Sequence, residues 1–307
     1  MLRYAVKRML GALPTLFLII TIAFFMMRLA PGGPFDKERN LPAQVEANLN
    51  KAYHLDEPLP QQYLRYVGNI LQGDFGPSFQ YKDFSVTELI WGGFPVSLRL
   101  GGLAILFAFG IGVALGTVAA LNQNSLTDYL VMGTAMTGIT IPNFVMAPLL
   151  TLVFGLYLSW LPVGGWGGGG IAHSVLPIVA LCLPQVAAIA RLTRGSMIEV
   201  LRSNFMRTAR AKGLPERVTI LRHGLKAAML PVVSYLGPAV ASIITGSVII
   251  EQIFGIPGIG RYFVQAALNR DYTLVMGVTI FYGVLIILFN LLVDLLYGLL
   301  DPKVRYD

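Results

Sequence analysis

The residues best suited to interact with another molecule are the cations of one stretch, FMRTARAKGLPERVTILRHGLKAAMLP, at residues 205–231. The wider connection, residues 191–228, holds nine lysines or arginines and only two acids, and it lies between two apolar stretches. A cation costs about 2.5–3.5 kcal/mol at the centre of a bilayer, so this connection cannot enter the membrane. It can rest on anionic lipids, or it can dock on a protein partner.

Residue patterns for catalysis or metal binding are missing. No G-x-x-x-x-G-K-[ST], H-E-x-x-H or G-x-S-x-G pattern occurs, and the glycine cluster at 164–170 lacks the phosphate-binding lysine. His54, His173 and His223 are scattered, and Cys182 is the single cysteine. We therefore expect no catalytic residue, metal site or cofactor in this chain.

Composition identifies the class of protein. Of 307 residues, 55% are apolar and 13% are charged, with a mean hydropathy of +0.66, whereas soluble domains carry about 25% charged residues. The net charge of +7 does not indicate nucleic-acid binding, because the cations flank apolar stretches. The sequence predicts an all-α integral membrane protein with six spans, each near the 20 residues that cross a bilayer: roughly 9–29, 96–121, 129–158, 173–190, 229–250 and 273–299.

Charge also predicts the orientation of the chain. With the amino terminus inside, fourteen lysines or arginines and six acids share its side, against nine cations and ten acids on the other side. The positive-inside rule then makes both termini cytoplasmic. The first span lacks an A-x-A cleavage site and is expected to remain as an anchor.

The remaining outer segment, residues 30–95, is expected to form a small extracytoplasmic subdomain. Pro42 could open one helix, and PQQYLRYVGNILQG has apolar residues at helical spacing with Gly73 as its stop. Ser85 and Glu88 fit a capping box. We therefore divide the chain into 1–29, 30–95, a core of 96–299 and a cytoplasmic tail of 300–307.

Two features lie within the predicted spans. Asp294 is the one acid well inside a span, and we expect it to pair with an interfacial cation or polar group rather than relay protons. Prolines interrupt the later spans at six positions, and bent helices could enclose a cavity, although membrane helices are richer in proline generally. These prolines are Pro142, Pro148, Pro177, Pro184, Pro231 and Pro238.

The basic connection itself has helical patterning. An apolar face of Met197, Val200, Leu201 and Phe205 predicts a helix that continues through TARAK and ends at Gly213 in the left-handed conformation. Pro215 suits the first turn of a second helix, with an apolar face of Val218, Leu221, Leu225 and Met229. A sharp reversal between two helices favours docking, although charge alone also fits lipid anchoring.

The motifs resemble those of permease subunits from bacterial peptide ABC importers, the oligopeptide permeases in particular. The similarity runs along essentially the whole chain, in order. The similar segments are PTLFLIITIAFFMMRLAPGGPF, GDFGPSF, GSMIEVL, RTARAKGL, LRHGLKAAMLPVV, IFGIPGIGRYFVQAALNRDY and LLDPKVRY.

The resemblance implies a type I ABC-importer fold in which residues 207–214 form most of a coupling helix. These residues are Arg207, Thr208, Ala209, Arg210, Ala211, Lys212, Gly213 and Leu214. In the wider family this motif begins with Glu-Ala-Ala, whereas here it begins with Arg207, Thr208 and Ala209. The contacts that the family's glutamate makes are therefore not expected in this chain.

The resemblance also implies the partners. They are a homologous second permease, two ATPase subunits that bind ATP and magnesium, and an extracytoplasmic peptide-binding protein that docks on segments 30–95 and 253–272. Dipeptides, nickel complexes or other small solutes are alternative cargoes, and an ion-coupled secondary carrier is an alternative function.

Overall fold

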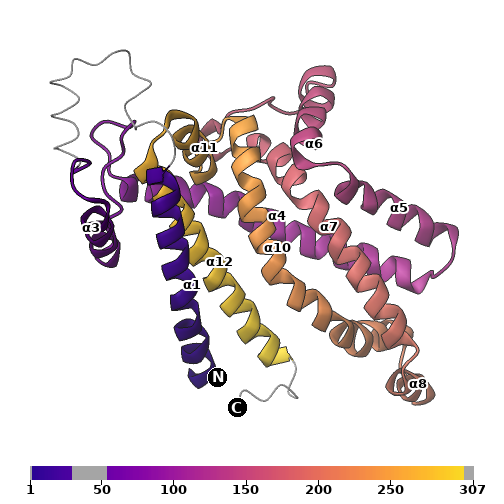
Figure 1. Ribbon diagram of the computed structural model, residues 1–307. Helices are drawn as coiled ribbons and strands as arrows, with labels where there is room; N and C mark the ends of the chain where they lie inside the picture. The colour runs from indigo at the N-terminus through magenta and orange to yellow at the C-terminus, as the bar shows by residue number, and fades with distance from the viewer. Residues whose placement is uncertain (1, 30–53, 301–307) are drawn as a thin grey trace.

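The computed structural model describes residues 2–29 and 54–300, and these are almost entirely helical (Figure 1). The helix predicted to open at Pro42 and the tail after residue 300 lie outside the described residues. The α-helices are α1 (Leu2–Leu29), α3 (Leu59–Leu71), α4 (Val86–Leu121), α5 (Leu126–Thr140), α6 (Asn143–Leu150), α7 (Ile171–Leu201), α8 (Asn204–Ala211), α9 (Glu216–Val218), α10 (Leu225–Phe254), α11 (Ile259–Asn269) and α12 (Tyr272–Leu300); η1 (Thr151–Tyr157) and η3 (Thr219–Gly224) are π-helical, and η2 (Gly167–Gly169) is a 3-10 turn.

Five helices of the described chain are long and apolar enough to cross a membrane. They are α1, α4, α7, the continuous run of α9, η3 and α10, and α12. The span expected at 129–158 is instead bent by 107° between α5 and α6. The helix ends before Pro142 because the residue that precedes a proline is disfavoured in the helical region. Ile141 accordingly has an extended backbone, with ψ of 117°. This pair supplies a sixth span only if its two arms count as one.

Two spans are longer than the hydropathy pattern predicts. The helix expected from residue 96 starts at Val86, where Ser85 and Glu88 form the predicted capping box. The boundary drawn at 95/96 therefore falls inside α4, which continues through Pro95. The span expected to end at residue 190 continues to Leu201, because cations near a membrane surface do not end a helix.

Packing between α4 and α7 depends on small residues. On α4, small side chains recur every four residues, which brings two helix backbones close together. They are Ala104, Ala108, Gly112, Gly116 and Ala120. A methyl group at Gly112 would lie 2.8 Å from Cβ of Ile189 on α7. The two helices therefore form the centre of the membrane body.

The elements segregate to two ends of the molecule (Figure 1). The start of α1, the end of α12 and α8 lie at one end, α6 and α11 lie at the other, and α3 lies beside the second half of α1. The predicted helix at 60–72 is confirmed as α3, and Gly73 follows it with φ of 79°. The predicted interfacial role of Asp294 also holds, because its carboxylate lies 2.8 Å from the guanidinium of Arg8.

The end that carries α11 is held together by contacts between two segments that are distant in the sequence. Asp271 is fully buried and accepts hydrogen bonds from Ser78 Oγ and, at 3.1 Å, from the backbone N–H of Leu274. Tyr81 Oη donates to Gln265 Oε1 nearby. Residues 73–85 and 265–273 thus form one continuous surface, which we call the distal surface.

Candidate functional site

The candidate site is α8, a short amphipathic helix that projects from one end of the molecule (Figure 1). Met206 and Ala209 are buried, whereas Arg207 and Thr208 are exposed and Phe205 is 49% exposed. The helix predicted to run unbroken from Met197 was wrong: α7 ends at Leu201, and α8 starts again at Asn204 after a β-region N-cap at Ser203. The Ser203 hydroxyl makes no cap bond to α8; it donates to Val200 O at 2.6 Å, a local bond that competes with a continuous helix.

The C-terminal end of α8 is a Schellman turn. Gly213 has φ of 73°, which confirms the predicted left-handed conformation. The N–H of Leu214 donates to Ala209 O at 3.4 Å, and the N–H of Gly213 donates to Arg210 O at 2.9 Å. These two bonds satisfy carbonyl groups that the end of a helix leaves free. The sharp reversal is therefore built into the backbone.

The chain returns with a different register from the one predicted. Pro215 precedes α9, as expected, but the π-helical η3 follows directly. Its wider turn shifts the later residues around the helix axis. Val218 precedes this turn and is exposed, as is Leu221 within it, whereas Thr219 and Gly224 are buried. The predicted apolar face was therefore wrong at Val218 and Leu221, but Leu225 and Met229 do pack against the hydrophobic core.

Met206 anchors α8 to the rest of the molecule. A methyl group at Gly224 of η3 would lie 3.3 Å from the terminal methyl of Met206 and 3.8 Å from that of Met197. Both methionines are fully buried. Thus α8 packs on η3, which also contacts the end of α7 through Met197, and the outer face of α8 remains free among the described residues.

The outer face is cationic but partly neutralised within the loop. Arg210 donates to Glu216 through Nη2 at 2.8 Å and Nε at 3.3 Å. The side-chain hydrogen bond with Glu216 raises the pKa of Arg210 above its usual value. Arg207 and Lys212 are exposed. All eight predicted residues thus lie together: Arg207–Ala211 in α8, Lys212 at its C-cap, and Gly213 and Leu214 in the turn.

One buried ion pair near this site was not predicted. Asp128 on α5 is 2% exposed, and Arg194 on α7 donates to both of its carboxylate oxygens at 2.6 Å. The N–H of Asn124 also donates to Asp128 at 2.9 Å. The pair fixes α5 against the α7 segment that leads to α8. Sequence gave no signal for it, because the partners are 66 residues apart.

A second missed residue is Glu251, which directly follows the predicted fifth span. It is fully buried, and its Oε2 accepts from the N–H of Gly260 at 2.8 Å. Ser97 Oγ accepts from the N–H of Ile259 at 2.9 Å. The two side chains together satisfy donors at the start of α11. An acid at the edge of an apolar span was the available signal.

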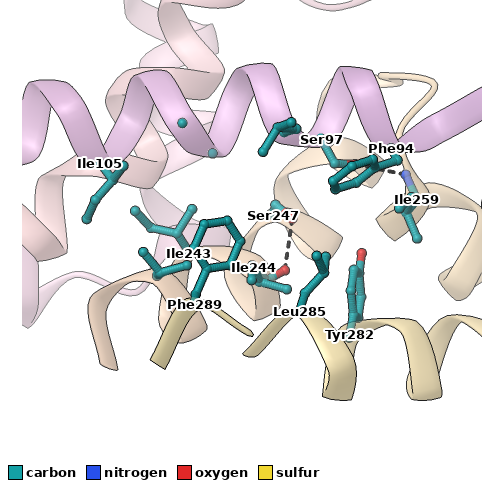
Figure 2. A pocket seen from close by; sticks show the side chains of 14 residues that line it. Phe94, Ser97, Ile105, Ile243, Ile244, Ser247, Ile259, Tyr282, Leu285 and Phe289 are labelled. Atoms are coloured by element: carbon teal, nitrogen blue, oxygen red, sulfur yellow. Dashed lines mark hydrogen bonds between the residues drawn. The ribbon is translucent and has the colours of Figure 1, made fainter. Parts of the chain in front are cut away.

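A cavity of about 120 Å³ lies beside Ser97, between α4, α10, α11 and α12 (Figure 2). Its walls are mostly aliphatic and aromatic side chains, among them Ile105, Ile243 and Phe289. Ser247 Oγ donates to Ile244 O at 2.9 Å and is thereby satisfied. This cavity offers few polar groups to a hydrophilic ligand.

If α8 is the coupling helix that the resemblance implies, replacing Gly213 by valine is expected to reduce ATP-dependent uptake strongly. A methyl at Gly213 would meet no atom within 4 Å, so the cost comes from the backbone alone. A β-branched residue resists positive φ, at a cost of about 1–2 kcal/mol. Gly213→Asn is the control, because asparagine tolerates this conformation and should preserve uptake. Equal uptake by the two variants would contradict a need for this turn.

Curated relatives match the entire chain. An oligopeptide transport system permease protein OppB of Escherichia coli strain K12 is 59% identical over 306 residues, covering 100% of both chains. The protein of the same description from Haemophilus influenzae is 57% identical with the same coverage. A dipeptide transport system permease protein DppB of Bacillus subtilis is 46% identical over 99% of this chain and 98% of its own length.

A solved structure shares the fold. The crystal structure of an amino acid ABC transporter with histidines superposes with a TM-score of 0.52 and 19% identity, covering 69% of this chain and 94% of that chain. Two family models also match. Residues 1–100 match the N-terminal model of these membrane components, and residues 112–306 match the model of the binding-protein-dependent transport system inner membrane component. The chain therefore belongs to the family of binding-protein-dependent transport system inner membrane components.

Proposed function

We propose that this chain is the permease subunit of an ATP-driven oligopeptide importer and forms half of its translocation pathway. It adopts a type I fold with six spans, in which α5, α6 and η1 together serve as the bent third span. The chain lies in the bacterial inner membrane with both termini and α8 in the cytoplasm. The placement of α8 with the start of α1 and the end of α12 supports this sidedness (Figure 1).

The observation that carries the mechanism is the geometry of α8. A rigid helix with its buried face on Met206 and Ala209 leaves Phe205, Arg207 and Arg210 directed outwards. Such a preorganised helix suits a groove on a partner. Residues 207–214 would be the coupling helix, and closure of two ATPase subunits would push on it. Those subunits would hold the ATP and magnesium, so the chain would have no cofactor of its own.

The remaining partners follow from the same assignment. A homologous second permease would complete the pathway, and an extracytoplasmic peptide-binding protein would dock on the distal surface. The hydrogen bonds between residues 73–85 and 265–273 support this role, because they make the surface rigid before docking. Lipid surrounds the spans, and no nucleic acid takes part.

Oligopeptides are favoured over dipeptides as cargo. Relatives described as oligopeptide permeases are 57–59% identical to this chain, whereas those described as dipeptide permeases are 40–46% identical. Much of the selectivity in such systems would belong to the binding protein, so the permease itself sets a weaker limit on peptide length.

Reconstitution tests the proposal. The chain alone in proteoliposomes should not move a labelled tripeptide down any ion gradient, and the complete assembly should take it up only with ATP and the binding protein. Uptake by the isolated chain would establish a secondary carrier instead. Crosslinkers at Lys82 and Asn269 should capture the binding protein in the same assembly, and failure of both would exclude the distal surface.

A further inference from the structure

A second cavity, of about 400 Å³, lies between α5, α7 and α10. Its volume falls within the range of about 300–1,000 Å³ that small-molecule sites occupy. The residues that line it are Ile139, Pro184, Gln185, Ala188, Arg191, Leu192, Tyr235 and Ser242. It presents an amide, two hydroxyls and a cation, whereas the polar side chains that line the cavity of Figure 2 are all hydroxyls.

The polar groups form a fixed network at the wall of this cavity. Gln185 is 4% exposed. Its Oε1 accepts from the hydroxyl of Tyr235 at 2.9 Å, and its Nε2 donates to Ser242 Oγ at 3.0 Å. Because an amide nitrogen carries two donors, Gln185 keeps one, and the Ser242 hydroxyl keeps its own. A buried network at this depth is preorganised to bind a polar ligand.

The surface around the cavity carries exposed hydroxyl groups. Ser242 and Thr245 on α10 are exposed, and so are Thr137 and Thr140 on α5. The three threonine hydroxyls donate to carbonyl groups of their own helices, so they tolerate lipid as well as water. This face of α5 and α10 would line a pathway if a second permease covers it, as the proposed function requires.

Arg191 gives the wall of the cavity a positive charge. It lies six residues beyond Gln185 on α7, about 9 Å along the helix axis. None of the residues that line the cavity is acidic. Among the described residues, the ion pairs do not include Arg191. A cation without an acidic partner beside a polar cavity favours an anionic ligand group.

We propose that this cavity is a transit subsite for peptide, in which Gln185 binds a backbone amide and Arg191 binds the terminal carboxylate. The inference rests on the proposed import function and assigns a substrate contact to it. The one-sided position of Arg191, on the α8 side of Gln185, orients the peptide with its carboxyl end leading towards the cytoplasm.

The first test compares two peptides in the complete importer. Arg191→Gln should lower uptake of labelled trialanine about ten-fold or more, the range for a hydrogen bond to a charged group, and leave uptake of trialanine amide unchanged. Arg191→Lys should retain most uptake of both peptides. Each variant is compared with the unmodified importer and the same binding protein, so the preference of the binding protein cancels.

The second test probes Gln185 and the cavity wall. Gln185→Met should lower uptake of trialanine and its amide equally, because both peptides share the backbone. In a Cys182→Ala background, Ser242→Cys should react with a charged thiol reagent, and trialanine should protect it. Leu288→Cys on α12 is the control: its side chain is 53% exposed on a candidate span but does not line the cavity. Lipid should cover it, so the charged reagent should leave it unlabelled.

Distinct results would overturn distinct claims. Equal loss of trialanine and its amide in Arg191→Gln would eliminate the carboxylate contact. Unprotected Ser242→Cys, together with normal uptake by Gln185→Met, would eliminate the subsite while the import function stands. Failure of the unmodified importer to take up trialanine would instead refute the proposed function and remove the basis of the subsite.

Discussion

Reversing Arg207 and Arg210 to glutamate together is expected to abolish ATP-dependent peptide uptake. Both side chains lie on the outer face of α8, which is free to meet a partner. The new glutamates would bring like charges together at an interface that complements the two arginines. Such repulsion costs several kcal/mol, which corresponds to a loss of more than a hundred-fold in binding affinity. Uptake into proteoliposomes measures the effect, and membrane insertion and binding-protein docking should remain normal.

A local effect of the substitution must be separated from the loss of docking. Arg210→Glu also breaks the ion pair with Glu216 and places two acids side by side. Adding Glu216→Arg restores the pair with its charges exchanged. If the triple variant recovers uptake, the pair matters and the external charge does not, which would contradict the docking assignment. Arg207→Lys with Arg210→Lys keeps both charges and should retain most uptake.

The second large effect is expected at the pair of Asp128 and Arg194. Arg194→Met leaves the carboxylate of Asp128, which is 2% exposed, without its bidentate partner. Removing one member of a fully buried pair costs about 3–5 kcal/mol, and because Arg194 is 28% exposed the cost here is expected to fall below that range. We expect a strongly lowered Tm in detergent and a reduced yield of folded protein.

The double variant Asp128→Asn with Arg194→Met is the matched control. Its asparagine oxygen can still accept from the N–H of Asn124, and no buried charge remains without a partner. The double variant should therefore be more stable than Arg194→Met alone. If both variants melt at the temperature of the unmodified protein, the pair does not stabilise the contact between α5 and α7.

Local patterns predicted the local features of this fold. The capping box at Ser85 and Glu88, the helix α3 and the left-handed Gly213 each depend on a few neighbouring residues, and the structure confirms all three. The spans were found because about 20 apolar residues are needed wherever a helix crosses lipid. Their ends were less accurate, because hydropathy reports burial in lipid rather than helix termination.

The errors have two physical sources. The π-helical turn at Thr219–Gly224 leaves Leu221 exposed, and the extended backbone at Ser203 breaks the helix that periodicity had joined. Both exchange one local hydrogen-bond pattern for another at little cost, so spacing alone does not reveal them. The polar cavity was missed because Gln185, Tyr235 and Ser242 come together only through packing.

The continuity of α7 joins two places that would serve different molecules under the two proposals above. Gln185 and Arg191 lie on the same helix as Met197, whose side chain lies near Gly224 as does that of Met206 on α8, and no proline separates them. If α8 is the coupling helix, a push on it would reach the cavity through this unbroken stretch of α7. Peptide binding in the cavity and the movement driven by the ATPase subunits would then change together, because the same helix takes part in both.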